Sequence, residues 1–321
     1  MKIALLWRRN RNVEFQQKLL CTVIPDDSRE EVNRHQEALE MCGHEVEIVE
    51  WASDPIRTIE TIRQGRYDLV FNASSLEEVA ILEGLGVPFA GSGIDLVSLD
   101  KIVRKEIVAY HGVNTPEFEV IQDPAADFTL TLVPPVIVKP ANGRNSAGIT
   151  EESIVSDVYG VLRQAQQIIC KLHQDALVER FVRGTEVTVG VIGNRCPKIF
   201  GVMEIEYDNT LTNTFEHKKD REVLHCPARL SDDARTRVEA DAMKAYRALR
   251  ARDYARIDMI VDEHDIPWFL ELNCFPGLHI LTGKEDHLHS SYMGTMAAHA
   301  GMCAADVYGV ILDVVQDRLN C

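Results

Sequence analysis

The first ninety residues alternate short apolar runs with amphipathic segments, and this order restricts the folds open to the chain. Residues 2–7, 45–50 and 67–72 are typical of strands, and residues 27–42 and 55–64 between them are typical of helices. Strands that alternate with amphipathic helices favour a parallel sheet. We therefore expect the chain to begin with an α/β lobe that ends near Gly93.

The pattern changes after this lobe. A helix is expected from Leu99 to Tyr110, followed by two strands, the turn-rich NGRNSAG, a helix over 154–172 and the strand ALVERFV. From Thr185 the runs TEVTVGVIG and PKIFGVMEI alternate as antiparallel strands do. A long helix over 232–250, two further strands and two closing helices complete the chain. The later part is therefore expected to be α+β.

Length and charge exclude several classes of protein. At 321 residues and 36.1 kDa the chain is long enough for two or three domains. Its formal charge of -16 repels a phosphate backbone unless basic residues gather locally, so no nucleic-acid partner is expected. The apolar run in MKIALLWRRN is too short for a signal peptide or a membrane span. We expect a cytoplasmic protein with no membrane partner and with reduced, scattered cysteines.

The segment ARIDMIVDEHDIPWFLELN gives the first indication of chemistry. Read as two strands joined by EHDIP, it places Arg256 and Asp258 on one face, with Phe269, Glu271 and Asn273 on the facing side of the next strand. The opposite face is expected to be core, and it carries Ile257, Met259, Trp268, Leu270 and Leu272.

If the two strands pair in register, three oxygen-bearing side chains converge: Asp258, Glu271 and Asn273. Two adjacent carboxylates need a counter-charge, and Mg²⁺ bound through carboxylates and nucleotide phosphates supplies one. Arg256 on the same face would add fixed positive charge for a phosphate or an oxyanion. A surface hairpin with solvated charges is the alternative interpretation of the same pattern.

A second element is a strand that ends in Lys139 and leads into the glycine-containing loop ANGRNSAG. Backbone amides of such a loop can fold over phosphates. The loop lacks the residue order of a P-loop and of a dinucleotide-binding turn, so neither of those folds is indicated.

With these elements in order, the chain resembles the ATP-grasp superfamily, and within it the D-alanine-D-alanine ligase-like family. The resemblance runs from about VPFAGSG to the C-terminus through VIVKPANGRNSAG, LVERFVRGTEVTVGVIG, FEHK, HCPARL, ARIDMIV, FLELNCFPG and MAAHAGM. It implies an ATP-grasp fold of three lobes: a Rossmann-like lobe over 1–95, a central lobe over 96–183 and a C-terminal lobe over 184–321. The nucleotide would lie between the last two lobes.

The resemblance also implies a role for individual residues. Lys101, Lys139 and Lys218 would contact ATP phosphates, and Ser146 would lie in the loop above them. Glu179, Phe181 and Val182 would hold adenine, with Glu186 on the ribose. Asp258, Glu271 and Asn273 would bind two Mg²⁺ ions, with Mn²⁺ as an alternative, while Arg256 and the Gly277 amide would stabilise the oxyanion. Taken singly, a solvated lysine is the better interpretation of Lys101, and a strand-end carboxylate is the better interpretation of Glu179 and Glu186. The ordered set of motifs reverses this for every residue except Lys218, whose loop aligns only with a short gap.

The implied reaction has two steps. A substrate carboxylate attacks the γ-phosphate of ATP to give an acylphosphate and ADP, and an amine then displaces phosphate to form an amide. The substrates would be amino acids or close analogues, and the family further implies a homodimer.

The amino-acid half departs from the family pattern. The first loop reads WRRNRNVEFQQ, in which Glu14 is a weak substitute for the family glutamate. Asn145 stands where the family has a loop serine, and Lys219 where it has a tyrosine. After Gly277 the segment LHILTGKEDHLHSSYMG is longer than in the family, and Ser290 or Ser291 would contact a substrate carboxylate. Its histidines are a weak signal for zinc.

Several functions stay open on the sequence. The leading hypothesis is a carboxylate-amine ligase with substrates other than two D-alanines, including an enzyme that cyclises one molecule. The alternatives are a true D-alanine-D-alanine ligase of peptidoglycan synthesis, a kinase that stops at the acylphosphate, and a non-catalytic ATP sensor. An intact set of Lys139, Arg256 and the three metal residues argues against the sensor.

Overall fold

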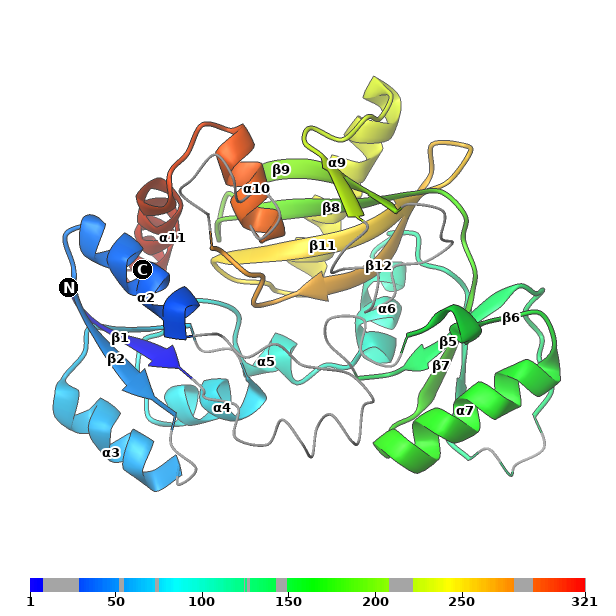
Figure 1. Cartoon of the computed structure of the whole chain (residues 1–321), viewed down its shortest axis with the longest axis horizontal. Coiled ribbons are helices and arrows are strands. Elements are labelled where there is room, and N and C mark those ends of the chain that lie inside the picture. The colour runs from blue at the N-terminus through cyan, green and yellow to red at the C-terminus, as the bar shows by residue number, and fades with distance from the viewer. Residues whose placement is uncertain are drawn as a thin grey trace.

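The protein is an α/β molecule with three sheets, seen side by side in the computed structural model (Figure 1). Each sheet is formed by residues of one of the three expected lobes, whose exact boundaries stay predictions. The structure describes residues 1–7, 29–51, 55–72, 75–123, 125, 128–142, 149–207, 222–279 and 291–320.

The first lobe contains a parallel sheet, as the sequence predicts, and its strands lie in the order β2-β1-β3. Helix α4 was not predicted, although Ser75 and Glu78 form a capping box at its start, a signal that is visible in the sequence. Gly43 has a φ of +83°, which suits a glycine directly after α2. The elements are β1 (Lys2–Trp7), α2 (Arg29–Met41), β2 (Glu45–Glu50), α3 (Pro55–Gly65), β3 (Leu69–Phe71) and α4 (Leu76–Gly84).

The central lobe is an antiparallel sheet in the order β4-β7-β5-β6, covered by one long helix. That helix begins at Val158, because residues 154–155, predicted as its first turn, pair with β5 instead. The elements are α5 (Ile94–Val97), α6 (Lys101–Tyr110), β4 (Phe118–Ile121), β5 (Val136–Pro140), β6 (Ile154–Val155), α7 (Val158–Leu172) and β7 (Ala176–Arg180).

The C-terminal lobe is an antiparallel sheet in the order β10-β9-β8-β11-β12. Helix α9 covers one face, and α10 contacts the other face at β8 and β9. Strand β10 lies partly in a segment that was expected to be irregular. The elements are β8 (Thr185–Ile192), β9 (Lys198–Tyr207), β10 (Glu222–His225), α9 (Asp232–Ala248), β11 (Tyr254–Val261), β12 (Pro267–Asn273), α10 (Tyr292–His299) and α11 (Ala304–Leu319).

The β11–β12 hairpin corrects one prediction. Asp258 pairs with Glu271, but Met259 pairs with Phe269, so Leu270 is an extra residue and forms a bulge. The bulge reverses the alternation, so Phe269 is fully buried in the core instead of lying beside Glu271. Trp268 and Leu270, predicted as core, are only half-buried. A strict period of two cannot reveal this change of face.

Close packing places α10 against the sheet. A Cβ at Gly190 would lie 2.8 Å from the Met293 sulfur, and a Cβ at Gly201 would lie 3.0 Å from the Met296 side chain. The two glycines therefore create the space in which α10 lies, and this fixes the first residues of the helix near β11.

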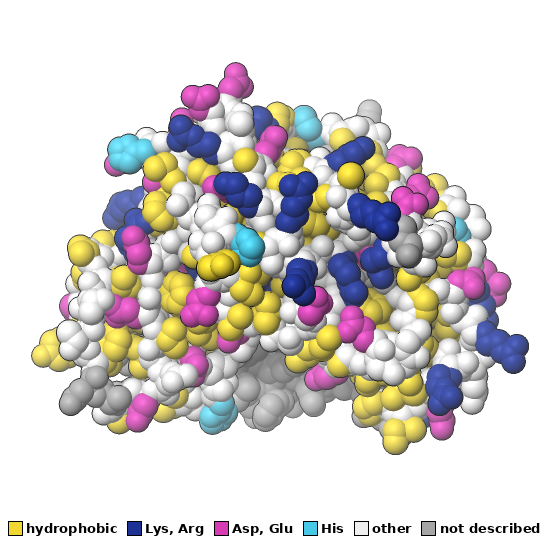
Figure 2. Space-filling model, turned by 180° about the vertical axis from the view of Figure 1, so that it is seen from behind, with side chains coloured by type: hydrophobic (Ala, Val, Ile, Leu, Met, Phe, Trp, Pro, Cys, Tyr) yellow, Lys and Arg dark blue, Asp and Glu magenta, His cyan; other side chains and the backbone are white. Residues whose placement is uncertain are grey.

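Two features of the surface bear on possible partners. Seen from behind (Figure 2), basic side chains gather over the upper half of the molecule. Within the described ranges, no single helix is long and apolar enough to cross a membrane. Helices α10 and α11 pass that test only together, as a pair bent by 106°.

Candidate active site

The predicted metal residues meet at the hairpin formed by β11 and β12. Arg256 lies opposite Asn273 and Asp258 opposite Glu271 in the strand register. The Asn273 amide nitrogen lies 2.9 Å from Asp258 Oδ2 and 3.4 Å from Glu271 Oε1. The structure therefore brings together the three oxygen-bearing side chains that the sequence placed on one face.

Arg256 is held in place on two sides. Its Nε and Nη2 donate to the two Asp258 oxygens at 2.9 and 2.8 Å, and its guanidinium carbon lies 4.9 Å from the centre of the Tyr292 ring. Burial lowers the pKa of Arg256, but the Asp258 charge outweighs burial and the net shift is upward. Arg256 is therefore a fixed positive charge, and Tyr292 is a contact that the sequence did not suggest.

Besides Arg256 and Asn273, a third residue donates to Asp258: the hydroxyl of Thr188 on β8 donates to Oδ1 at 2.6 Å. Thr188 is fully buried. Cross-strand pairing of Asp258 with Thr188 explains the contact, which depends on β8 and β11 being neighbours. The sequence order of the strands does not reveal that adjacency.

The cluster fits a hard divalent cation. Two carboxylates and an amide oxygen are the ligand types that Mg²⁺ takes. Their negative charge is balanced in the structure by Arg256 and by Lys101, whose Nζ lies 3.4 Å from Glu271 Oε2. A Mg²⁺ ion held here would share the carboxylate oxygens with these two cations, and the phosphates of a bound nucleotide would supply the additional negative charge.

A second buried cluster lies between the central and C-terminal lobes, around Glu179. Lys139 Nζ lies 2.6 Å from Glu179 Oε2, and Lys105 Nζ lies 2.9 Å from Oε1 in an ion pair outside hydrogen-bond geometry. Burial raises the pKa of Glu179, but the two lysines outweigh it and lower the pKa overall. The predicted residues Lys139 and Glu179 are thus direct partners.

Lys105 is a residue that the sequence analysis missed. Its side chain is fully buried, and Nζ donates to Thr115 Oγ1 at 2.7 Å and to the Phe269 carbonyl at 3.4 Å. Burial lowers its pKa to about 8, against the opposing effect of Glu179. A lysine in a charged helix is usually solvated, so only its spacing of four residues from Lys101 could have drawn attention to it.

The remaining ATP-binding candidates follow this cluster along the chain. The Phe181 amide donates to the Pro135 carbonyl at 3.1 Å, Val182 is buried, and Glu186 lies on β8 between Ile205 and Ile260 of the adjacent strands. Their contacts with adenine and ribose stay predictions.

Gly277 is exposed and lies beside Ser291 and His279. A Cβ at Gly277 would lie 3.0 Å from the Ser291 Cβ, so any side chain there would press against Ser291. Ser291 is the N-cap of α10 and accepts from the Gly294 amide. Ser291 is therefore placed next to the predicted oxyanion donor.

Six predicted residues lie outside the described ranges: Glu14, Asn145, Ser146, Lys218, Lys219 and Ser290.

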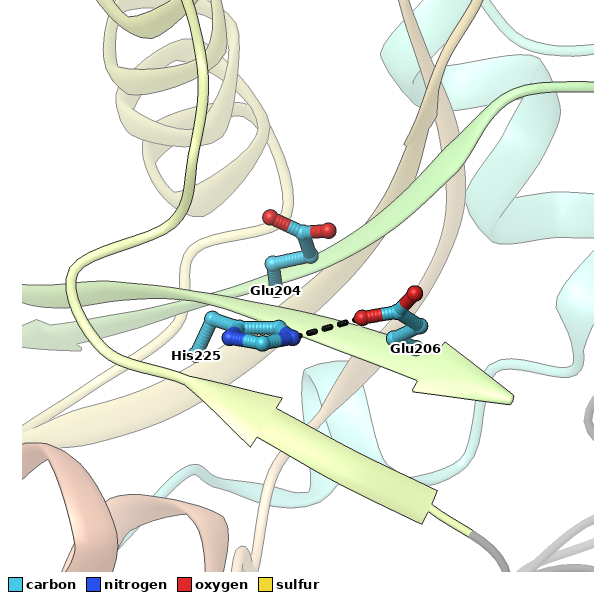
Figure 3. A group of neighbouring side chains, drawn as sticks. All are labelled: Glu204, Glu206 and His225. Carbon is cyan, nitrogen blue, oxygen red and sulfur yellow. Dashed lines mark hydrogen bonds and ion pairs between the residues drawn. The ribbon is translucent and has the colours of Figure 1, made fainter. Parts of the chain in front are cut away.

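A further group with metal-ligand spacing lies on the α9 side of the sheet: Glu204 and Glu206 of β9 with His225 of β10 (Figure 3). His225 Nε2 lies 2.7 Å from Glu206 Oε2, and Arg229 donates to Glu204 and Glu206. Because Arg229 already balances both carboxylates, this group is a satisfied ion-pair network and we assign it no metal.

Comparison with known proteins agrees with this geometry. The family model of the D-ala D-ala ligase C-terminus matches residues 105–307. The chain is 36% identical over 247 residues to the D-alanine--D-alanine ligase of Bordetella pertussis, which covers 72% of this chain and 71% of that protein. It is 30% identical over 303 residues to uncharacterized protein y4sG of Sinorhizobium fredii, covering 88% and 86% of the two chains.

Solved structures show the same fold. The D-alanine--D-alanine ligase of Bacillus anthracis complexed with ATP superposes with a TM-score of 0.75 at 20% identity, over 99% of this chain and 98% of that one. VanG D-Ala:D-Ser ligase of Enterococcus faecalis superposes with a TM-score of 0.70 at 18% identity, over 98% of each chain. The chain therefore belongs to the ATP-grasp D-alanine-D-alanine ligase-like family and is an ATP-dependent ligase.

Proposed function

We propose that this ligase joins the carboxylate of one amino-acid-like substrate to an amine through an acylphosphate. The observation that carries the proposal is the cluster of Arg256, Asp258, Glu271 and Asn273 on the hairpin. Lys101 connects this cluster to the central lobe, and Lys139 lies on β5 of that lobe. Such an arrangement of fixed cations and oxygen ligands suits the transfer of a phosphoryl group.

The lysines have a defined electrostatic task in this proposal. Glu179 holds Lys139 at 2.6 Å and Lys105 at 2.9 Å, so both ammonium groups are fixed before ATP binds. Cations that are already positioned lose little freedom on binding a polyphosphate. Asp258, Glu271 and Asn273 would hold Mg²⁺, which when bound neutralises phosphate charge.

Arg256 and Gly277 would act on the second step. When the amine attacks the acylphosphate carbonyl, negative charge develops on its oxygen. The Arg256 guanidinium and the Gly277 N–H would stabilise that charge. Arg256 is protonated throughout the physiological pH range, and its ion pair with Asp258 holds it in place.

The identity of the substrates separates the remaining candidates. D-alanine is the substrate named for several relatives, so a true D-alanine-D-alanine ligase is the second candidate. The changes at Glu14, Asn145 and Lys219 favour other amino acids or cyclisation of one molecule. A homodimer and a cytoplasmic location stay predictions.

One experiment tests the proposal. The protein is mixed with ATP, Mg²⁺ and a panel of D- and L-amino acids, singly and in pairs, while ADP, phosphate and product mass are followed. We expect ADP release together with a product lighter by one water than its substrates. ATP binding without ADP release for every substrate would instead indicate a sensor, and ADP release without an amide would indicate a kinase.

A further inference from the structure

The imidazole of His279 lies beside the predicted oxyanion donor. A Cβ built on Gly277 would lie 3.5 Å from His279 Cε1 and 3.6 Å from Nδ1, so the ring edge faces the Gly277 backbone. Gly277 is exposed and His279 is half-buried. A molecule that reaches the Gly277 amide would therefore meet the imidazole.

Backbone contacts fix this position. The Ser291 N–H and hydroxyl both donate to the His279 carbonyl, at 3.2 and 3.1 Å. Gly294 packs against the same carbonyl, since a Cβ there would lie 2.2 Å from the His279 oxygen. The next residue after Ser291 is Tyr292, whose ring contacts Arg256. His279 is thus anchored to the first turn of α10, which also contacts the predicted catalytic arginine.

The second step of the proposed reaction needs a base. An attacking amine must lose a proton. The carboxylates described above on the hairpin and on β7 are engaged with cations: Asp258 with Arg256, Glu271 with Lys101, and Glu179 with two lysines. An imidazole is the side chain best suited to accept a proton near neutral pH.

We propose that His279 is the general base for amide formation, an inference that rests on the proposed function. The amine nitrogen forms a bond to the acylphosphate carbon, and the carbon–oxygen bond to phosphate breaks. Phosphate leaves with that electron pair, and the proton released by the amine passes to the His279 imidazole. The imidazolium then returns its proton to water.

The groups that face His279 are compatible with this role. His35 on α2 lies near enough to interact electrostatically with it, and burial together with that interaction lowers the pKa of His35 to about 4. His35 is therefore neutral at working pH and presents no charge to His279. From α10, Ser291 contacts the His279 carbonyl, while the Tyr292 hydroxyl donates to Glu222 at 2.7 Å.

The test separates the two steps with one variant, His279→Gln. Donor amino acids that release ADP with the wild type are used with two acceptors, an ordinary amine and hydroxylamine, which needs no base. We expect His279→Gln to slow amide formation about 100-fold while hydroxamate formation stays within about two-fold.

Two further variants complete the test. Added imidazole should restore at least part of amide formation in His279→Ala, which a purely structural residue would not permit. His299→Gln, an exposed histidine at the far end of α10, should behave as the wild type in both reactions. Equal loss of both reactions in His279→Gln, or no loss in either, would overturn the role. Absence of ADP release from the wild type with every donor would overturn the proposed function and this role with it.

Discussion

The C-terminal lobe contacts the first lobe and the central lobe in different ways. With the first lobe it shares one apolar core, in which Leu5 and Phe71 pack with Met203, Met293 and Ile311. The central sheet has its own core, and the central lobe meets the C-terminal lobe partly through apolar Leu96, Val108 and Val113 and partly through polar contacts. Arg180, for example, stacks on Trp268 at 4.4 Å, and Arg104 donates to the Leu272 carbonyl.

The difference indicates which of the two interfaces is affected by nucleotide binding. An apolar interface is stable without a ligand, whereas an interface of lysines and carboxylates changes its electrostatic balance when a nucleotide binds. We therefore expect changes at the first interface to alter stability and changes at the second to alter catalysis.

The largest effect is expected at Asp253, a fully buried residue at the first interface. It accepts hydrogen bonds from Arg318, Asn194 and the Gly91 amide, so it joins three segments of the chain. Asp253→Ala leaves the Arg318 charge without its partner and should lower the free energy of unfolding by about 3 kcal/mol or more.

Chemical denaturation measures this loss. The control is Asp317→Ala, a substitution of the exposed aspartate that directly precedes Arg318 in the chain. Because Asp253 has a φ of +62°, Asp253→Asn is a useful second variant that tolerates the backbone conformation. A loss of ATP binding by folded Asp253→Asn would contradict the separation of the two interfaces.

The next effect concerns pH at the same interface. His35 hydrogen-bonds Tyr308 across α2 and α11, and its pKa is lowered from 6.5 to about 4, mainly by burial. The unfolded chain therefore binds a proton that the folded chain excludes between these pH values. Stability should fall as pH drops from about 6.5 to 4, by about 3 kcal/mol from this group. Unfolding curves of the wild type and His35→Gln should differ in slope over this window, and parallel curves would refute the assignment.

At the second interface we expect Glu271→Gln to reduce ADP release about 100-fold. The substitution removes the negative charge with which this residue would bind the metal and with which it pairs with Lys101. The melting temperature should change little, since Glu271 is only half-buried. Glu263→Gln, in the exposed turn of the same hairpin, is the matched control. Near-normal turnover of Glu271→Gln would remove the basis for the metal assignment.

The sequence predicted the first lobe's parallel strands and the face that joins Arg256, Asp258, Glu271 and Asn273. Both depend on local periodicity, which a sequence displays directly. The bulge at Leu270 and the burial of Lys105 depend on residues distant in the chain, because Lys105 reaches Glu179 only after α6 packs on β7 and β12. Tertiary contacts of this kind leave no periodic signal.

The smallest effect is expected at Tyr292, which contacts the second site from α10. Tyr292→Phe keeps the ring on Arg256 and removes the hydrogen bond to Glu222. The kcat should therefore fall no more than about three-fold, which corresponds to the loss of one hydrogen bond worth about 0.6 kcal/mol. Tyr292→Leu also removes the ring and should lower kcat about ten-fold, with the KM for ATP unchanged. Steady-state kinetics of both variants measure the difference. If Phe and Leu are equally impaired, the hydroxyl and not the ring positions Arg256, and the link from α10 to the site runs through Glu222.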